Sequence, residues 1–212
     1  MNRYILILTL SNQAMIDRLL TPLYWETTEG ATTMILNQGG SKIKVSRKAV
    51  VYHSDENLGC AGGRHFLVSQ LLPDLERDDQ LVFLDDDVEV LDRYWLWKLC
   101  SPLAGEYSIS GVDGRKVTSE YLTEPCIETP DFVSGGWCAI RGDVFLDSCM
   151  FDMQFNPNYW EDVDLQAQAR AIGKRIICTP DVGLQHIHPA NEAAAQLVAI
   201  NRQKFIEKWD KK

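Results

Sequence analysis

The stretch Leu81–Val90 reads Leu-Val-Phe-Leu-Asp-Asp-Asp-Val-Glu-Val and joins four apolar residues to three consecutive carboxylates. Its apolar half has the length and composition of a buried strand. Three neighbouring carboxylates repel one another, so keeping all of them ionised costs free energy. A divalent cation would relieve this repulsion, and Asp oxygens suit hard ions such as Mg²⁺ or Mn²⁺. A solvated acidic turn after a strand is the competing interpretation, and this stretch alone does not separate the two.

Three further apolar strands are expected before this stretch, at Tyr4–Leu8, Thr32–Leu36 and Ala49–Tyr52. One helical segment, capped by Ser11 or Asn12, follows the first strand, and another lies between the third strand and Leu81, where it follows a glycine-rich loop and ends near Pro73. The apolar face of the first helix is formed by Ile16, Leu19, Leu20 and Leu23. Alternating strands and helices predict an α/β fold with a mostly parallel central sheet and helices on both faces.

The second half of the chain is less regular. Ligands of such sheets bind outside the carboxyl ends of the strands, where Thr9, Asn37 and the Asp triplet fall. We expect the region Gly105–Pro130 to form loops over this site. The other expected elements are a helix at Asp92–Leu103, a strand at Phe132–Ile140 broken by Gly135–Gly136, a helix stopped by Gly173, a strand at Arg175–Cys178 and a terminal helix at Asn191–Trp209.

The bulk composition is that of an ordinary globular protein and excludes several classes. A chain of 212 residues fits one domain, and its net charge of −9 gives no overall basic field for nucleic acid or acidic lipid. Apolar runs are too short for a transmembrane helix, and the first residues lack the features of a signal peptide. The six cysteines show no metal or redox spacing, so we expect reduced thiols in a cytoplasmic protein.

Five pieces of the chain, taken in order, resemble the nucleotide-sugar-dependent glycosyltransferases of family 2, which have the GT-A fold. Each piece alone is weak, whereas the set in this order is a strong signal. The resemblance runs from about Tyr4 to Pro189 and looks closest to the bacterial rhamnosyltransferase-like members. The five pieces are Asn57–Arg64, Leu84–Val88, Val133–Gly136 with Ile140–Arg141, Trp160–Leu165, and Pro180–Asp181 followed by His186.

The resemblance implies a metal and diphosphate site. Asp85 and Asp87 match the ends of the family's Asp-x-Asp motif, so Asp85 would face the nucleotide or metal and Asp87 would bind Mn²⁺ or Mg²⁺. A fixed cation stabilises the charge that gathers on a departing nucleoside diphosphate. His186 matches the late histidine that often completes the metal shell, although His188 is an open alternative. Asp86 falls on the donor side without a defined role.

The resemblance also implies a general base. Asp162 matches the residue that deprotonates the acceptor hydroxyl, so that in-line attack on the anomeric carbon inverts its configuration. Glu161 is the alternative base. Carboxylates are also common at helix starts, where they complement the dipole and the free N–H groups, and that interpretation remains open for both.

Several residues are expected to bind the donor. Asn57, Gly59 and Arg64 match the family's donor-binding turn, where a glycine-rich helix start suits close approach of a nucleotide. A tight turn with a surface arginine is the competing interpretation. The remaining donor-side candidates are Thr9, Asn12, Asn37 and the pair Gly135 and Gly136, which matches a segment lining the sugar.

One departure from the family weakens the donor assignment. Asn37 occupies the position of an Asp that accepts a hydrogen bond from uracil or thymine, and an amide can accept or donate. A UDP- or dTDP-sugar is therefore favoured without excluding others. The acceptor stays open between a glycan, a lipid-linked sugar, a protein and a modified nucleobase. We expect a single domain with a donor half at about 1–103, an acceptor half at about 104–190 and a C-terminal helix at 191–209.

Two rival classes fit poorly. A nucleotidyltransferase needs a glycine-rich, basic loop after its first strand, and Thr9–Asn12 has neither feature. An EF-hand beginning at Asp85 would need Gly and Glu where Val90 and Leu96 stand. A catalytically inactive relative that binds a sugar nucleotide remains a further alternative.

Overall fold

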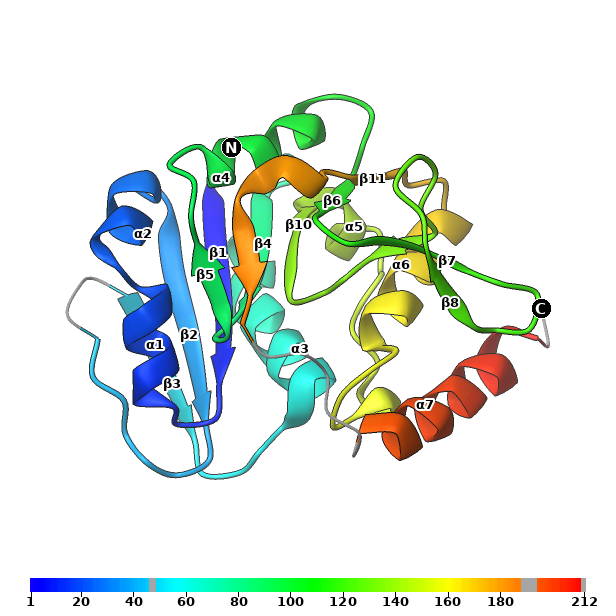
Figure 1. The fold of residues 1–212 in the computed structure, drawn as a ribbon, viewed down its shortest axis with the longest axis horizontal. Helices are drawn as coiled ribbons and strands as arrows, with labels where there is room; N and C mark the ends of the chain where they lie inside the picture. Colours follow the sequence, from blue (N-terminus) through cyan, green and yellow to red (C-terminus); the bar gives the residue numbers. More distant parts are fainter. Residues whose placement is uncertain (46–48, 188–193, 211–212) are drawn as a thin grey trace.

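The computed structural model describes residues 1–45, 49–187 and 194–210. Its centre is a seven-stranded sheet in the order β11-β6-β10-β4-β1-β2-β3 (Figure 1). All neighbouring strands pair in parallel except β10, which is antiparallel to both β4 and β6, so the predicted mostly parallel sheet is confirmed. The strands are β1 (Arg3–Thr9), β2 (Thr32–Gln38), β3 (Ala49–Ser54), β4 (Gln80–Asp85), β6 (Ile109–Gly111), β10 (Trp137–Arg141) and β11 (Ile176–Cys178).

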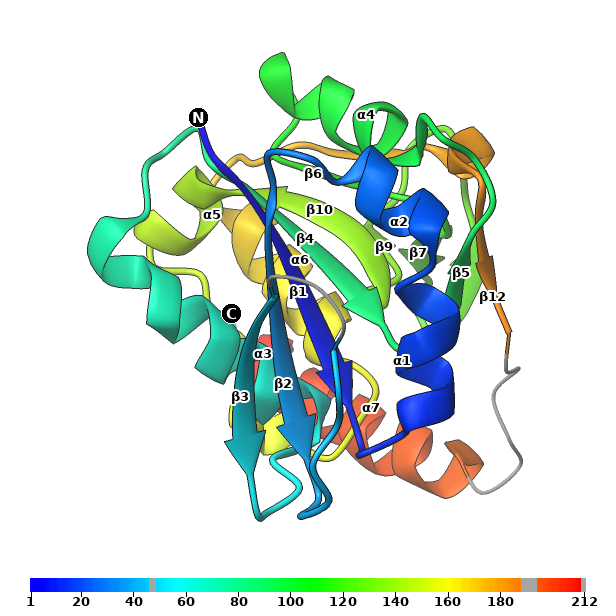
Figure 2. The ribbon, with the colours of Figure 1, turned by 90° about the vertical axis from the view of Figure 1, so that its left-hand side faces the viewer.

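Helices cover both faces of this sheet, because its central strands are apolar on both sides (Figure 2). In β1, Ile5 and Ile7 belong to the core on one face, whereas Leu6 and Leu8 belong to the core on the other. The first face is covered by α1 (Gln13–Leu19), α2 (Pro22–Thr27) and α4 (Trp95–Cys100), and the second by α3 (Gly59–Leu71), α5 (Gly142–Leu146) and α6 (Glu161–Ala171).

Two small sheets and a terminal helix complete the fold. One small sheet pairs β5 (Val88–Val90) with β12 (Leu184–His186), and the other contains β7 (Gly114–Val117), β8 (Thr123–Pro125) and β9 (Phe132–Val133). The terminal helix α7 (Ala194–Trp209) packs beside α6 through a third apolar cluster that includes Phe155, Trp160 and Phe205. Short 3₁₀ turns occupy Leu72–Asp74, Ser101–Ala104, Met153–Phe155 and Pro180–Val182.

Some predicted boundaries differ from the structure for local reasons. The first predicted helix is two helices, because Thr21 caps a new one through its hydroxyl and Pro22 occupies its first turn. The helix predicted from Asp92 begins at Trp95, since the Asp92 carboxylate accepts the Tyr94 N–H and forms a turn instead. The predicted strand Phe132–Ile140 is divided between two sheets, with β9 on β7 and β10 on β4.

Three local features escaped the sequence prediction. They are the pairing of β5 with β12, the short helix α5 and the separation of β7–β9 from the central sheet. The start of the predicted terminal helix, Asn191, lies outside the described residues. Among the residues that the structure does describe, no helix is long and apolar enough to cross a membrane.

Candidate active site

A cavity of about 630 Å³ opens where β4 and β10 meet the start of α6. Its walls come from segments far apart in the sequence: the end of β4, the β5–β12 pair, the β7–β8 hairpin and the loop before α6. Seven of the residues predicted from the sequence line it, namely Arg64, Asp85, Asp87, Gly136, Glu161, Asp162 and His186.

The three consecutive Asp side chains have different environments. Asp85 ends β4 and accepts a hydrogen bond from Arg64, whereas Asp87 lines the same cavity beside His186. Asp86 instead accepts from the Thr9 hydroxyl at 2.5 Å, and burial raises its pKa to about 6. The chain runs close to Asp85 on one side, since a Cβ added to Gly136 would lie 2.3 Å from an Asp85 oxygen. The triplet therefore presents two carboxylates to the cavity and one to β1.

Asp87 and His186 form the part of the cavity suited to a metal ion. The β5–β12 pairing brings them together, with His186 Nε2 3.0 Å from Asp87 Oδ2. The other oxygen, Asp87 Oδ1, is buried and has no hydrogen-bond partner among the residues that the structure describes, and burial raises the pKa of the carboxyl group. An unpartnered carboxylate oxygen beside an imidazole fits a Mn²⁺ or Mg²⁺ ligand pair.

The described residues contain no group of three or more His, Cys, Asp or Glu side chains arranged to hold a metal ion. An ion here would therefore need ligands from a bound diphosphate and water in addition to Asp87 and His186. His188, the alternative ligand, lies outside the described residues.

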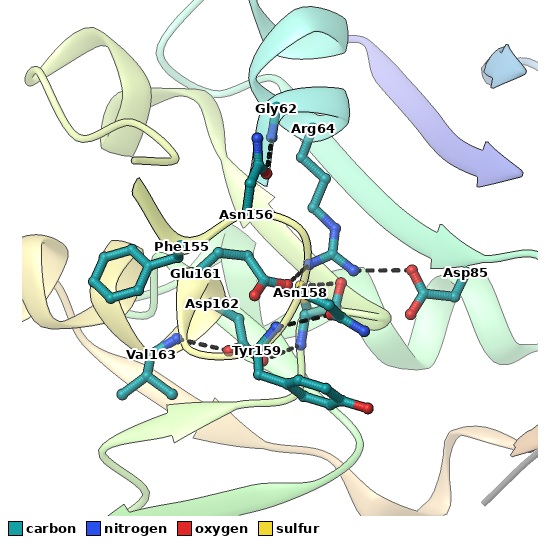
Figure 3. A network of polar contacts seen from close by, with 12 residues as sticks. Gly62, Arg64, Asp85, Phe155, Asn156, Asn158, Tyr159, Glu161, Asp162 and Val163 are labelled. Atoms are coloured by element: carbon teal, nitrogen blue, oxygen red, sulfur yellow. Dashed lines mark hydrogen bonds and ion pairs between the residues drawn. The ribbon is translucent and has the colours of Figure 1, made fainter. Parts of the chain in front are cut away.

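Arg64 links Asp85 at the end of β4 to Glu161 at the start of α6 (Figure 3). Its side chain is buried, with Nη1 2.7 Å from Glu161 Oε1 and Nη2 2.9 Å from Asp85 Oδ1. Both carboxylates raise the pKa of Arg64 against the effect of its burial, so the guanidinium stays charged. The arginine predicted to contact the nucleotide or phosphate is thus already paired with two carboxylates, and its contact with a donor stays a prediction.

Glu161 and Asp162 occupy the start of α6, with Asp162 held by the backbone. Asp162 Oδ2 accepts the Gly135 N–H at 2.9 Å, and Oδ1 accepts the Val163 N–H at 2.8 Å. Burial raises the pKa of Asp162 despite these hydrogen bonds. Burial and the neighbouring Asp162 raise the pKa of Glu161 to about 7, and no group in the described part of the chain hydrogen-bonds to the buried Glu161 Oε2. Glu161 can therefore accept a proton near neutral pH, and Asp162 accepts one at a higher pH than an ordinary Asp side chain does.

The loop that leads into α6 has an unusual backbone. Tyr159 and Trp160 both have a φ of 71°, which is uncommon for residues with a side chain. Asn201 of α7 holds this loop, because its buried side-chain amide donates to the carbonyls of Phe155, Asn158 and Tyr159 at 2.7 to 3.1 Å. Sequence reasoning missed Asn201, although a polar residue between Val198 and Phe205 on the apolar side of an amphipathic helix was an available signal.

The glycine-rich loop serves contacts within the protein. Gly59 has a φ of +71°, and a Cβ there would lie 2.8 Å from the backbone of Pro157. The first N–H groups of α3 are occupied: Gly59 donates to Asn57 Oδ1, Cys60 to the Pro157 carbonyl and Gly62 to Asn156 Oδ1. Neither Asn57 nor Gly59 lines the cavity, so their role in donor binding stays a prediction.

A second group of predicted residues gathers at the carboxyl ends of β1 and β2, outside the cavity lining. Asn37 is buried, and its Oδ1 accepts from the backbone and hydroxyl of Ser11 while its Nδ2 donates to the Ser41 carbonyl. Asn12 caps α1 by accepting the Met15 N–H. Thr9, Asn12 and Asn37 therefore fix loops in this structure, and base recognition by Asn37 stays a prediction.

Sequence reasoning also missed four residues that shape the cavity. Trp137 lies beside His186 with ring centroids 5.5 Å apart, and Tyr159, Ser134 and Arg115 complete the wall on the side of α6 and β7. Trp137 directly follows Gly135–Gly136, so its position next to a quoted motif was an available signal. Arg115 lies in the irregular region, where no motif marked it.

No protein-family model and no curated protein matches this sequence. Solved structures do match the fold. GalNAc-T7 with UDP, GalNAc and Mn²⁺ gives a TM-score of 0.72 at 13% identity, over 98% of this chain and 48% of that chain. The mannosyltransferase PcManGT from Pyrobaculum calidifontis, in complex with GDP-Man and Mn²⁺, gives 0.67 at 15% identity, over 99% of this chain and 63% of that chain.

TarS residues 1–349 from S. aureus give a TM-score of 0.62 at 14% identity, over 85% of this chain and 58% of that chain. The chain thus spans about half to under two thirds of the length of these three proteins. Identities of this size carry information on architecture alone, and the chain has the GT-A fold.

Proposed function

We propose that this protein is an inverting, metal-dependent glycosyltransferase that moves a sugar from a nucleoside-diphosphate donor to an acceptor hydroxyl. The observation that carries the proposal is one cavity, in a GT-A fold, that has Asp87 and His186 on one wall and Asp162 on another. In-line displacement needs a cation at the leaving diphosphate and a base at the attacking hydroxyl, on opposite sides of the anomeric carbon.

The charge of the cavity supports a requirement for a divalent cation. Its lining includes five carboxylates, from Asp85, Asp87, Asp113, Glu161 and Asp162, against two guanidinium groups, from Arg64 and Arg115. Both arginines are already paired with carboxylates. A diphosphate would add negative charge to this surface, so a Mn²⁺ or Mg²⁺ ion held by Asp87 and His186, with Asp85 near it, would supply the missing positive charge.

Asp162 is the better candidate for the base. Two backbone N–H groups fix its orientation, and each carboxylate oxygen keeps a second lone pair for the acceptor proton. Glu161 is more buried and is held by Arg64, which suits a residue that positions its neighbours. Asp85 would lie toward the nucleotide, with its carboxylate in the space that a side chain at Gly136 would occupy.

The donor is proposed to be a UDP- or dTDP-sugar bound by the half of the domain at about 1–103. Two of the matched structures contain a nucleotide together with Mn²⁺, UDP in GalNAc-T7 and GDP-Man in PcManGT, which supports a nucleotide donor and a metal. The half at about 104–190 would bind the acceptor. All six cysteines are free thiols, which supports a reducing, cytoplasmic compartment.

A thermal-shift panel tests this proposal directly. UDP-, dTDP-, GDP- and CDP-sugars are each added to the protein, with Mn²⁺ and with EDTA. We expect one nucleotide class to raise Tm in the presence of Mn²⁺ and not in EDTA, because ligands that bind the native state stabilise it. The absence of any nucleotide-dependent shift with Mn²⁺ would contradict the proposed function.

A further inference from the structure

A second cavity, of about 530 Å³, lies beside α6 between the end of the β7–β8 hairpin and α7. In Figure 1 the hairpin and α7 lie next to each other on the side of the molecule away from β1–β3. Val163, the residue after the proposed base, lines both this cavity and the candidate active site. One side chain therefore stands between the two cavities.

Three elements, β7, α6 and α7, contribute residues to both cavities. On each element these residues lie on one face. On β7, Arg115 lines the first cavity and Val117 the second, and residues two apart share one face of a strand. On α6, Val163 is followed at helical spacing by Ala167 and Arg170 in the second cavity.

The third element is α7, where Val198 lines the first cavity while Phe205 and Trp209 line the second, again at helical spacing. From Arg115 to Val117 the advance is about 7 Å, and from Val163 to Arg170 it is about 10 Å. The two cavities are thus neighbours along α6, with Val163 as their shared wall.

The lining of the second cavity combines aromatic rings with hydroxyl and charged groups. Tyr121, Phe205 and Trp209 form a row in which successive ring centroids are 6.3 and 6.0 Å apart. Thr118 and Ser119 contribute hydroxyl groups. A saccharide presents apolar C–H faces and hydroxyl edges, so rings beside polar donors and acceptors suit it.

The charged groups of this cavity are balanced. Arg170 Nη1 lies 2.9 Å from Asp131 Oδ1, and these are the only arginine and acidic residue in the lining within the described part of the chain. A balanced pair of this kind offers N–H donors and carboxylate acceptors to neutral hydroxyls, and it gives no net positive charge for the phosphates of a nucleic acid. The same polar groups disfavour a lipid tail, whose burial would leave them unpaired.

We propose that this second cavity is an acceptor subsite, and that it holds sugar units of an oligosaccharide acceptor beyond the one that carries the reacting hydroxyl. The proposal rests on the proposed function and narrows its acceptor to a glycan. The glycan chain would run from Asp162 along α6 toward Arg170, with Tyr121 and Trp209 at its distal end.

Saccharide binding in the absence of donor tests this subsite. The probes are glucose, galactose, mannose, rhamnose and N-acetylglucosamine and their linear di- and trisaccharides, titrated into the full chain and followed by saturation-transfer NMR and calorimetry. We expect at least one trisaccharide to bind about tenfold or more tightly than its monosaccharide, because it fills both cavities. If no member of the panel gains affinity with length, the proposal is overturned.

A matched pair of substitutions at the C-terminal end of α6 tests whether the second cavity causes the gain in affinity with saccharide length. Ala171→Trp fills the second cavity from an exposed lining position, and Ile172→Trp adds the same side chain at the next exposed residue, outside the lining. We expect Ala171→Trp to abolish the gain with length and Ile172→Trp to preserve it. Equal length dependence in both variants would place saccharide binding elsewhere and overturn the subsite. Nucleotide binding with Mn²⁺, measured on the same samples, reports separately on the proposed function.

Discussion

Asp162 is the residue on which the proposed transfer chemistry depends. Replacing it with Asn keeps the size of the side chain and removes the proton acceptor. We expect Asp162→Asn to lower kcat by about 10²–10⁴-fold, the usual contribution of a general base, with donor affinity nearly unchanged. Steady-state kinetics and nucleotide titration of the same preparation measure both quantities.

Glu161→Gln is the matched comparison for this prediction. It changes the neighbouring carboxylate, whose role we propose to be the positioning of Arg64. Undiminished transfer by Asp162→Asn together with a large loss in Glu161→Gln would reverse the two assignments.

The same two carboxylates predict how activity depends on pH. A general base works in its ionised form, so the rate falls as the pH drops through its pKa. Burial raises the pKa of Asp162, and it raises that of Glu161 to about 7. We expect kcat/KM to fall on the acidic side with a midpoint higher than an ordinary Asp side chain would give, because burial disfavours the ionised form of the base. A profile that stays flat down to pH 4 would contradict this, and Glu161→Gln should retain the acidic limb because Asp162 remains.

Only some of the contacts around the Asp triplet could be predicted from the sequence. Asp87 and His186 were paired from the motif order, and the structure brings them within 3.0 Å of each other. The ion pairs of Arg64 could not be read from the motif, because they depend on side-chain directions at three distant elements. The same holds for Asp86, whose partner Thr9 lies 77 residues away.

At the scale of elements, the contact between the start of α3 and the loop at Asn156–Pro157 has a direct test. Gly59 has a positive φ, and an added Cβ would meet the Pro157 backbone at 2.8 Å. Gly40 also has a positive φ, with nothing within 4 Å of an added Cβ. We expect Gly40→Ala to lower the free energy of unfolding by about 1 kcal/mol from backbone strain alone. Gly59→Ala should cost more than about 2 kcal/mol, and urea unfolding that gives equal losses would refute the close contact.

Helix α7 supports the loop that presents the proposed base. Asn201→Ala removes the amide that donates to three carbonyls of this loop. We expect a loss of about 1–3 kcal/mol in stability and a fall in kcat of about tenfold or more, with the KM for donor unchanged.

Ile200→Ala is the control for this prediction, since Ile200 is 47% exposed and adjacent on the same helix. Equal turnover in the two variants, measured well below their Tm values, would show that α7 does not position the base. Faster amide hydrogen exchange at Tyr159–Val163 in Asn201→Ala than in Ile200→Ala would instead show, independently of activity, that α7 holds this loop.

Local patterns explain which elements were predictable. The apolar runs of β1, β2 and β4 are continuous because both faces of these strands are buried, and such runs are visible in the sequence. By contrast, β5 and β12 are three residues each and exist through pairing across 94 residues or more. The hydrogen bonds from Asn201 to the loop before α6 are likewise long-range contacts, so no local sequence pattern indicates them.

At the scale of the whole molecule, both the net charge of the chain and the charge of the candidate active-site cavity are negative. The chain carries a net charge of −9, and the candidate active site concentrates acidic groups whose arginine partners are already engaged. An acidic surface repels a nucleoside diphosphate at long range and again on contact. Under the proposed function, donor binding would therefore require that a cation arrive with the diphosphate or before it.

This requirement gives a last prediction, on removal of the metal. We expect EDTA to weaken the binding of UDP, or of whichever nucleotide the panel selects, by about 100-fold or more, because the diphosphate then faces carboxylates alone. Asp87→Asn should lose most of the gain that Mn²⁺ provides, since it removes the carboxylate with the unpartnered buried oxygen. Glu89→Gln, at a half-exposed neighbour whose carboxylate pairs with Arg18 at the surface, should keep that gain. Calorimetry with and without EDTA measures the nucleotide affinity in both conditions. Equal affinities would show that nucleotide binding to this protein needs no metal.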